Sequence, residues 1–180
     1  MKAVKEIGFK KSLKFIVYQI VQVVLQLVFI PQLRVVLLRL CGVRIGRNSI
    51  VYNVRFMNLY RGSFKNLHIG NNCFIGDGVV FDLAGTITIE DNVTVSQESL
   101  LLTHFNVGYK NHPLQKLYPS AVSHVIVKRH SFIGVRTTIL PSVTLGEYTV
   151  TGAGSVVIKS VASKKMIAGV PAKVIKSLQI

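Results

Sequence analysis

The sequence predicts an all-β solenoid, a parallel β-helix, with an α-helical segment before it and one protruding loop. From Val127 to Ala162 the chain repeats every six residues, and the fifth position of each hexad is small or β-branched. Neither a helix nor a plain strand has a period of six. In a parallel β-helix each hexad forms one flat side, and three hexads close one coil. The six hexads open at Val127, Ile133, Ile139, Leu145, Thr151 and Val157.

Residues 1–42 are expected to form a helical segment. The run from Phe15 to Ile30 is apolar except for one tyrosine and three glutamines, whose spacing of three and four places their amides on one stripe of a helix. Pro31 suits the first turn of a second helix, and Gly42 suits its end. Because no signal-peptide cleavage site follows the apolar run, we expect the segment to be retained.

Two roles are open for this helical segment. A basic, very apolar helix followed by a basic amphipathic one fits a segment lying in the cytoplasmic leaflet. Its glutamines would be costly in a membrane span, and the run is short for one. Alternatively, the helices cap the open end of the solenoid, as repeat proteins require. We expect a cytoplasmic protein held peripherally at the inner face of the cell membrane.

The solenoid is expected over residues 43–163, followed by a C-terminal tail at 164–180. Its phase slips by two residues around 84–88, and the chain makes a long excursion between Leu101 and Val127. We interpret residues 107–126 as a loop thrown out of the coil, because a loop of this length in a compact domain is usually functional. The earlier hexads open at Ile69, Ile75, Phe81, Ile89, Val95 and Leu101.

Composition indicates one domain and an anionic partner. The chain has 180 residues, 49% of them hydrophobic, which is enough for a sizeable core. Its 22 Lys and Arg against 7 acidic residues give a formal net charge of +15. No nucleic-acid-binding motif accompanies this charge, so we do not expect nucleic acid as a partner. Cys41 and Cys73 lack metal or redox spacing, and we expect them to be reduced in the cytoplasm.

Five histidines are the candidates for acid–base chemistry near neutral pH. His104 ends the last regular hexad before the excursion, where the coil wall would hold it rigidly beside a loop. His68 and His130 are expected to be wall residues, and His112 and His124 lie in the loop. His104 is therefore the candidate general base, with His112 as the next choice.

The run from Ile133 to Lys159, closed by A-G-V-P-A-K-V-I-K from Ala168 to Lys176, resembles the hexapeptide-repeat O-acetyltransferases. The resemblance covers about residues 43–176 and is closest to galactoside and maltose acetyltransferases and to those of bacterial surface-polysaccharide gene clusters. It implies a left-handed coil, an exception to the usual handedness of parallel connections. It also implies a homotrimer with active sites between subunits, and acetyl transfer from acetyl-CoA to a sugar hydroxyl.

The resemblance also suggests roles for individual residues. The family's catalytic histidine matches His104, which follows Thr103. Asp82, at the edge of the first interruption, is a candidate for holding a sugar hydroxyl. No metal is expected to be required. The positions that match the acetyl-CoA site are Val135, Ala153 and Ile158 along the pantetheine arm, and Lys159, Lys173 and Lys176 at the phosphates.

Other functions remain open at this point. The basic, apolar N-terminus replaces the polar segment of the soluble sugar acetyltransferases, which favours a surface-polysaccharide or lipid-linked glycan intermediate as acceptor. A serine or amino-sugar N-acetyltransferase is the nearest alternative. A γ-class carbonic anhydrase would need three zinc-binding histidines between subunits. A non-catalytic, membrane-associated trimeric scaffold is the third alternative.

Overall fold

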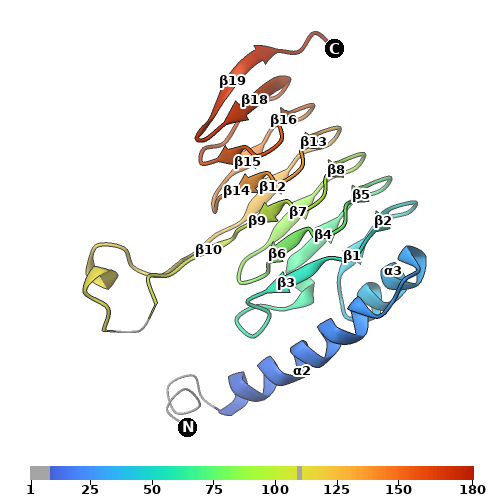
Figure 1. Cartoon of the computed structure of the whole chain (residues 1–180), viewed down its shortest axis with the longest axis vertical. Helices are drawn as coiled ribbons and strands as arrows, with labels where there is room; N and C mark the ends of the chain where they lie inside the picture. Colours follow the sequence, from blue (N-terminus) through green and yellow to red (C-terminus); the bar gives the residue numbers. More distant parts are fainter. Residues whose placement is uncertain (1–8, 109–110) are drawn as a thin grey trace.

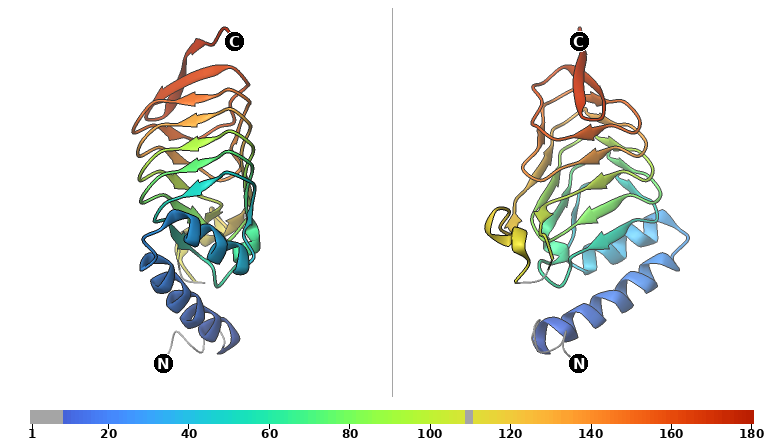
Figure 2. Two further views of the ribbon diagram at one scale, coloured as in Figure 1. Left: turned by 90° about the vertical axis from the view of Figure 1, so that its right-hand side faces the viewer. Right: turned by 60° about the vertical axis from the view of Figure 1, so that its left-hand side comes forward.

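The computed structural model describes residues 9–108 and 111–180, in which two helices precede a coil of short parallel strands. Figure 1 shows the strands stacked in layers, with one loop projecting from the side of the coil. The helices lie at the N-terminal end and a strand pair lies at the other, as the side views in Figure 2 also show. The expected all-β solenoid with an N-terminal helical segment is confirmed.

The helical segment consists of α2 (Phe9–Gln26) and α3 (Pro31–Leu40). Pro31 occupies the first turn of α3, and Gly42 follows the helix with a φ of 102°, a backbone conformation that favours glycine. Between the helices, the buried Arg34 guanidinium donates hydrogen bonds to the carbonyls of Leu25 and Val28. No helix within residues 9–108 and 111–180 is long and apolar enough to cross a membrane.

Each coil contributes one strand to each of three walls, whose strands pair in parallel. The first wall contains β1 (Arg44–Ile45), β4 (Leu67–Ile69), β7 (Ile87–Ile89), β12 (Val125–Val127) and β15 (Thr144–Leu145). The second contains β2 (Ile50–Val51), β5 (Phe74–Ile75), β8 (Thr94–Val95), β13 (Phe132–Ile133) and β16 (Val150–Thr151). The third contains β3 (Arg55–Met57), β6 (Val80–Asp82), β9 (Leu100–Leu101), β14 (Thr138–Ile139) and β17 (Val156–Val157).

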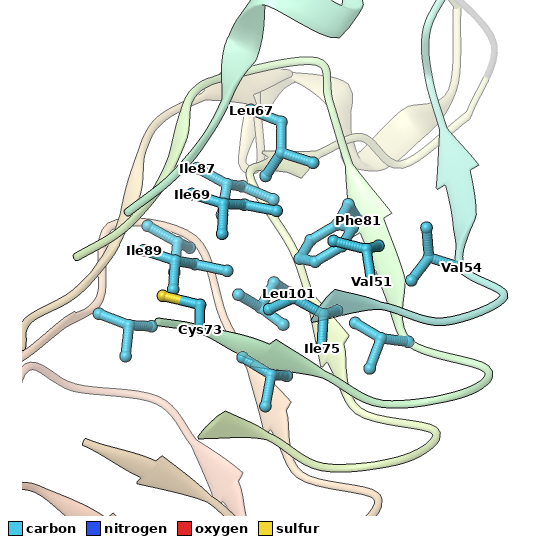
Figure 3. Close-up of a cluster of buried hydrophobic side chains, with 14 of the residues drawn as sticks. Val51, Val54, Leu67, Ile69, Cys73, Ile75, Phe81, Ile87, Ile89 and Leu101 are labelled. Atoms are coloured by element: carbon cyan, nitrogen blue, oxygen red, sulfur yellow. The ribbon is translucent and has the colours of Figure 1, made fainter. Parts of the chain in front are cut away.

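The hexad pattern has a direct physical cause in the coil interior. The opening residues of successive hexads are buried and stack on one another, as Figure 3 shows for Ile69 and Ile89 of the first wall. The fifth positions also point inward, where small hydroxyl side chains close the corners of the coil. Ser131 Oγ donates to the Gly146 carbonyl at 3.0 Å, and Ser155 Oγ donates to the Gly152 carbonyl at 2.6 Å. A larger side chain at these positions would not fit.

The register of the first wall locates the interruptions of the coil. Val127 pairs with Leu145, a separation of 18 residues, whereas Ile69 and Ile89 are 20 apart and Ile89 and Val127 are 38 apart. The two-residue slip and the long excursion are therefore confirmed. A further interruption, which the sequence analysis missed, separates Ile45 from Ile69 by 24 residues. It contains the 3-10 turn η1 (Phe64–Asn66).

The excursion begins as a two-stranded ribbon. Strand β10 (His104–Phe105) pairs antiparallel with β11 (Ala121–Val122), and η2 (Pro113–Lys116) lies between them. The coil resumes with β12 at Val125, so the expected loop of 107–126 is wrong at its end. The last two of those residues already pair with β7, because the apolar alternation of the wall begins there.

The residues expected to form a tail fold into a hairpin. Strand β18 (Lys165–Gly169) pairs in parallel with β16 and extends the second wall, and β19 (Ala172–Ser177) pairs antiparallel with β18. Ile167 is buried above Thr151, so the hairpin closes the C-terminal end of the core.

Candidate active site

His104 follows β9, a central strand of the third wall, at the point where the chain leaves the coil and the excursion begins. Strand β9 delivers Leu101 to the core, and Thr103 is fully buried two residues later. Thr103 Oγ1 donates to the Asp82 carbonyl at 2.6 Å and accepts from Gly85 N at 2.9 Å. These bonds fix the chain immediately before His104. The imidazole is thus held by the rigid wall on one side and by the ribbon of the loop on the other.

Two polar side chains meet the Nδ1 atom of His104. Asp82 Oδ2 lies 3.8 Å away, and Asn58 Nδ2 lies 3.4 Å away. Asn58 also donates to Asp82 Oδ1 at 2.7 Å. Asn58 comes from the turn after β3, and Asp82 from the end of β6 on the next coil. The three side chains form one cluster, which we call the His104 cluster.

The other ring nitrogen of His104, Nε2, is buried and has no hydrogen-bond partner among the described residues. An unpaired buried polar atom costs free energy, and a catalytic role is one of the reasons for which a protein keeps one. A base that removes a proton through Nε2 needs its proton on Nδ1. The Asp82 carboxylate, 3.8 Å from Nδ1, favours this arrangement electrostatically. In this tautomer the Asn58 amide donates to Asp82 Oδ1 and not to Nδ1.

The environment keeps His104 neutral. Burial lowers the pKa of the imidazole below its ordinary value, the Asp82 carboxylate opposes this shift, and the positive charge of Arg61 adds to it. The side chain is 15% exposed, so the charge effects are only partly screened by water. At neutral pH the ring is therefore in the form that can accept a proton.

Asp82 is placed differently from what its expected role suggests. Its side chain is 1% exposed, and its carboxylate accepts hydrogen bonds from Asn58, from Ala84 N at 3.2 Å and from Thr103 N at 3.1 Å. With these bonds, Asp82 holds Asn58 and the backbone at Ala84 and Thr103 in place beneath His104. Contact with a sugar hydroxyl stays a prediction.

Four of the six expected acetyl-CoA residues lie in two groups at the two ends of β17 (Val156–Val157), and the other two lie on the C-terminal hairpin. Val135 and Ala153 lie at one corner on successive coils, where Gly154 N donates to the Val135 carbonyl at 2.8 Å. A side chain added at Gly154 would meet nothing within 4 Å, so this corner is open to a ligand. Ile158 and Lys159 follow β17 at its other end.

Ile158 and His104 belong to the same edge of the third wall. Leu102 N donates to the Ile139 carbonyl, and Leu140 N donates to the Val157 carbonyl, so residues 102, 140 and 158 form a column. Both Val135 and Ile158 are exposed, at 40% and 44%. A long ligand lying across the outer surface of the third wall would reach from the first corner toward His104.

The two C-terminal lysines are exposed on the hairpin, away from His104. Lys173 pairs with Ala168 and Lys176 pairs with Met166. The hairpin is joined to the open corner by a hydrogen bond of 3.3 Å from Gly169 N to Ser155 Oγ. Lys173, opposite Ala168, therefore lies close to the open corner, whereas Lys176 is three residues further along β19 and Lys159 lies at the other end of β17.

The remaining histidines lie outside the cluster. His112 Nδ1 accepts from Leu114 N and caps η2, and His130 stacks on Tyr148 with ring centroids 4.6 Å apart. His68 lies on the outer surface of the first wall. Within residues 9–108 and 111–180, no three His, Cys, Asp or Glu side chains gather as metal ligands would.

Comparison with known proteins extends this picture. A family model described as the hexapeptide repeat of succinyl-transferase matches residues 67–96 and 124–159. The chain is 32% identical over 148 residues to WcaF of Escherichia coli K12, named as a colanic acid biosynthesis acetyltransferase. That match covers 79% of this chain and 74% of WcaF. It is also 32% identical over 115 residues to the galactoside O-acetyltransferase of the same strain, covering 63% of this chain and 55% of the relative.

A solved structure shows the same fold. The chain superposes on a hexapeptide-repeat acetyltransferase of Vibrio cholerae, solved with acetyl coenzyme A, with a TM-score of 0.77 and 23% identity. The superposition covers 89% of this chain and 84% of the other. Likenesses of this kind confirm the expected left-handed parallel β-helix.

Proposed function

Because the chain belongs to the hexapeptide-repeat acetyltransferases, we propose that it transfers the acetyl group of acetyl-CoA to a sugar hydroxyl, with His104 as general base. The observation that carries the proposal is the unpartnered, buried Nε2 of a histidine whose surroundings keep it neutral. The names of the relatives support acetyl transfer as the reaction, and Nε2 of His104 is the atom that would remove the proton.

The proposed reaction needs one proton-transfer group. A sugar hydroxyl is a poor nucleophile at neutral pH, so Nε2 removes its proton as the oxygen attacks the thioester carbonyl. The new C–O bond forms, the C–S bond then breaks, and the imidazolium returns the proton to the departing thiolate. The Asp82 carboxylate stabilises the transient positive charge on the ring, while backbone N–H groups of the wall stabilise the oxyanion.

The acetyl-CoA site is proposed along the outer surface of the third wall. The pantetheine arm would contact Val135, Ala153 and Ile158, and the phosphates would meet Lys159, Lys173 and Lys176. Because Lys159 lies across the wall from the hairpin, it would meet a different phosphate group from the other two lysines. The exposure of these side chains and the open space at Gly154 support this placement. The name of the Vibrio cholerae structure, which contains acetyl coenzyme A, supports the choice of acyl donor.

The proposed acceptor is a sugar of a surface polysaccharide or of its lipid-linked intermediate. Colanic acid biosynthesis, named for WcaF, supports a polysaccharide, and the galactoside of the second relative supports a sugar hydroxyl. The exposed apolar face of α2, which includes Ile16, Ile20 and Val24, supports peripheral attachment to an anionic membrane.

We also propose a homotrimer. A column of outward side chains on the second wall runs through Ile50, Phe74, Thr94 and Phe132 in the strand register, and all but Thr94 are apolar. Ile50 and Phe132 are 37% and 44% exposed in the single chain. Burying this apolar column against another copy would remove it from water.

Acetyl-CoA cleavage with a panel of sugars, amino sugars and serine tests the proposal. Mass spectrometry of the products identifies O- or N-acetylation, and no acceptor-dependent cleavage would favour the scaffold. We expect His104→Ala to lower transfer by about two to four orders of magnitude, which is the contribution of a general base, with acetyl-CoA affinity kept. His68→Ala, on the outer wall, is the matched control. If His104→Ala retains more than about a tenth of the rate, His104 is not the base.

A further inference from the structure

A pocket of about 240 Å³ lies between α2 and the segment that follows β3. Helix α2 contributes aromatic and amide side chains to one side of the pocket. The end of β3 and the turn after it form the other side. Neither the hexad pattern nor the acetyl-CoA residues account for it. Its lining residues are Phe15, Tyr18, Gln19, Gln22, Phe56, Met57, Asn58, Leu59 and Tyr60.

The pocket is connected to the His104 cluster through one residue. Asn58 lines the pocket and also contacts His104 Nδ1 and Asp82 Oδ1. Tyr60, on the same wall, accepts a hydrogen bond of 3.0 Å from Arg61 Nε. Arg61 is close enough for its charge to act on His104. A molecule in the pocket would therefore lie beside the proposed base.

The chemistry of the lining suits a sugar. Phe15 and Tyr60 meet edge to face with centroids 6.0 Å apart, and aromatic surfaces of this kind cover the apolar faces of sugar rings. The exposed Gln19 amide can donate to and accept from hydroxyl groups. The Gln22 amide oxygen is already used, because it accepts from Phe56 N at 2.8 Å.

The rim of the pocket is cationic. Arg61 is exposed, and its guanidinium lies 5.5 Å from the centre of the Tyr60 ring. Lys14 Nζ lies 5.5 Å from the Tyr18 ring and donates to the Gly62 carbonyl at 2.6 Å. Neither cation forms a salt bridge with a carboxylate of the described residues. Two cations beside a site that suits a sugar indicate that the bound molecule also carries an anionic group.

An exposed apolar surface begins at the same place. Phe15 lines the pocket and is also 47% exposed, and the outer side of α2 continues from it through Ile16, Ile20 and Val24. A hydrocarbon chain could lie along these side chains. Aromatic and amide groups thus line the pocket, two cations lie on its rim, and an apolar strip extends from it along α2.

We propose that this pocket binds a glycosyl phosphate whose phosphate is esterified to a long-chain membrane lipid. The sugar ring lies in the pocket against the edge-to-face pair of Phe15 and Tyr60, the phosphate is held by Arg61 and Lys14, and the lipid chain follows α2. The inference rests on the proposed acetyl transfer and narrows the acceptor to the lipid-linked form. A neutral, finished polysaccharide would leave the cations and the apolar strip without a role.

Calorimetry on the full chain, with coenzyme A present to fill the nucleotide site, tests the proposal. The probes are farnesyl phosphate, farnesol and inorganic phosphate. Farnesyl phosphate should bind at least about tenfold more tightly than either of the others, since the charged contact adds to the apolar one. Arg61→Gln should reduce its affinity toward that of farnesol, with Lys14 as the remaining cation. Arg47→Gln, which changes an exposed arginine at a different corner of the coil, should not.

Three outcomes would overturn the proposal: equal binding of farnesyl phosphate and farnesol, equal binding of farnesyl phosphate and inorganic phosphate, or an unchanged affinity in Arg61→Gln. The second would indicate a site for free phosphate. Because the readout is binding and not turnover, a failed binding test leaves acetyl transfer by His104 standing. A failed transfer assay likewise leaves the binding result standing.

Discussion

At the scale of residues, the charge state of His104 is set by opposing neighbours. Burial and Arg61 favour the neutral imidazole, whereas Asp82 favours the protonated one. Both forms are needed in turn, because the ring must first accept a proton and then return it. Asp82 and Arg61 therefore act on the same step in opposite directions.

This opposition predicts two opposite changes in the pH dependence of transfer. The rate falls as acid protonates His104. Asp82→Asn removes the group that raises the pKa, so the acid limb of kcat/KM should move to lower pH. Arg61→Gln removes a group that lowers the pKa, so the limb should move to higher pH. Asp82→Asn should also reduce the maximal rate by about tenfold to a hundredfold, because the imidazolium loses its counter-charge. If the acid limbs of kcat/KM of the two variants shift in the same direction, this account is contradicted.

The hexad pattern places the candidates His104 and Asp82 beside interruptions of the coil, but it marks neither of their partners. Asp82 ends β6 just before the two-residue slip, and His104 begins β10 at the start of the excursion. Asn58 and Arg61 lie in the interruption between β3 and β4, where no periodicity marks a position. Asn58 precedes His104 by 46 residues, and only the stacking of successive coils brings them together. The loss of hexad phase between Val51 and Leu67 was the available signal.

At the scale of elements, the C-terminal hairpin is a rigid support for cations. Residues 164–180 were expected to be a tail, because a motif identified by resemblance carries no strand register. Their strands instead extend the second wall. The hairpin therefore presents Lys173 and Lys176 on a fixed surface, with Lys173 closer to the open corner at Gly154.

We expect Lys173→Glu combined with Lys176→Glu to weaken acetyl-CoA binding by about tenfold or more at low ionic strength. The rate at saturation should change much less, because contacts with the distant phosphates act equally on ground and transition states. Titration calorimetry and steady-state kinetics measure the two effects. The control is Arg44→Glu with Arg47→Glu, which changes net charge equally at the other end of the coil. Equal losses in both double variants would mean that only net charge matters.

Helix α2 caps the coil, and membrane attachment, its other expected role, stays a proposal. Leu25 is buried in the core, and Gln22 and Lys14 bond to the coil, so the helix covers the end of the solenoid. Its opposite side remains apolar and exposed. The glutamine stripe was a correct prediction of a polar seam, but that Gln22 bonds to β3 required the structure.

Substitution on the exposed side of α2 tests membrane attachment. Ile20→Glu should weaken sedimentation with vesicles of anionic lipid by about tenfold or more, because an apolar side chain is replaced by a charge of the wrong sign. Gln26→Glu adds the same charge at an exposed polar position of the helix and is the matched control. Both proteins should keep the circular dichroism of the wild type. If the wild type does not sediment with vesicles, α2 is only a cap.

At the scale of the whole molecule, the coil holds sites that are distant in sequence in fixed relation. Six-residue periodicity was sufficient to predict the solenoid, because each hexad repeats one packing environment. It predicted the two-residue slip and the long excursion but not the interruption between Ile45 and Ile69, which contributes Asn58 to the His104 cluster. The net charge of +15 gives the molecule a long-range attraction to anionic surfaces, acyl donors and acceptors alike.

Mass spectrometry of surface glycan tests the central claim most directly. The glycan is isolated from cells that carry this protein, from cells that lack it, and from cells that carry His104→Ala at the same protein level. We predict O-acetylated sugar only with the wild-type protein, and unmodified sugar in the other two. Equal acetylation in wild-type and His104→Ala cells, or glycan that does not change when the protein is absent, would contradict the account.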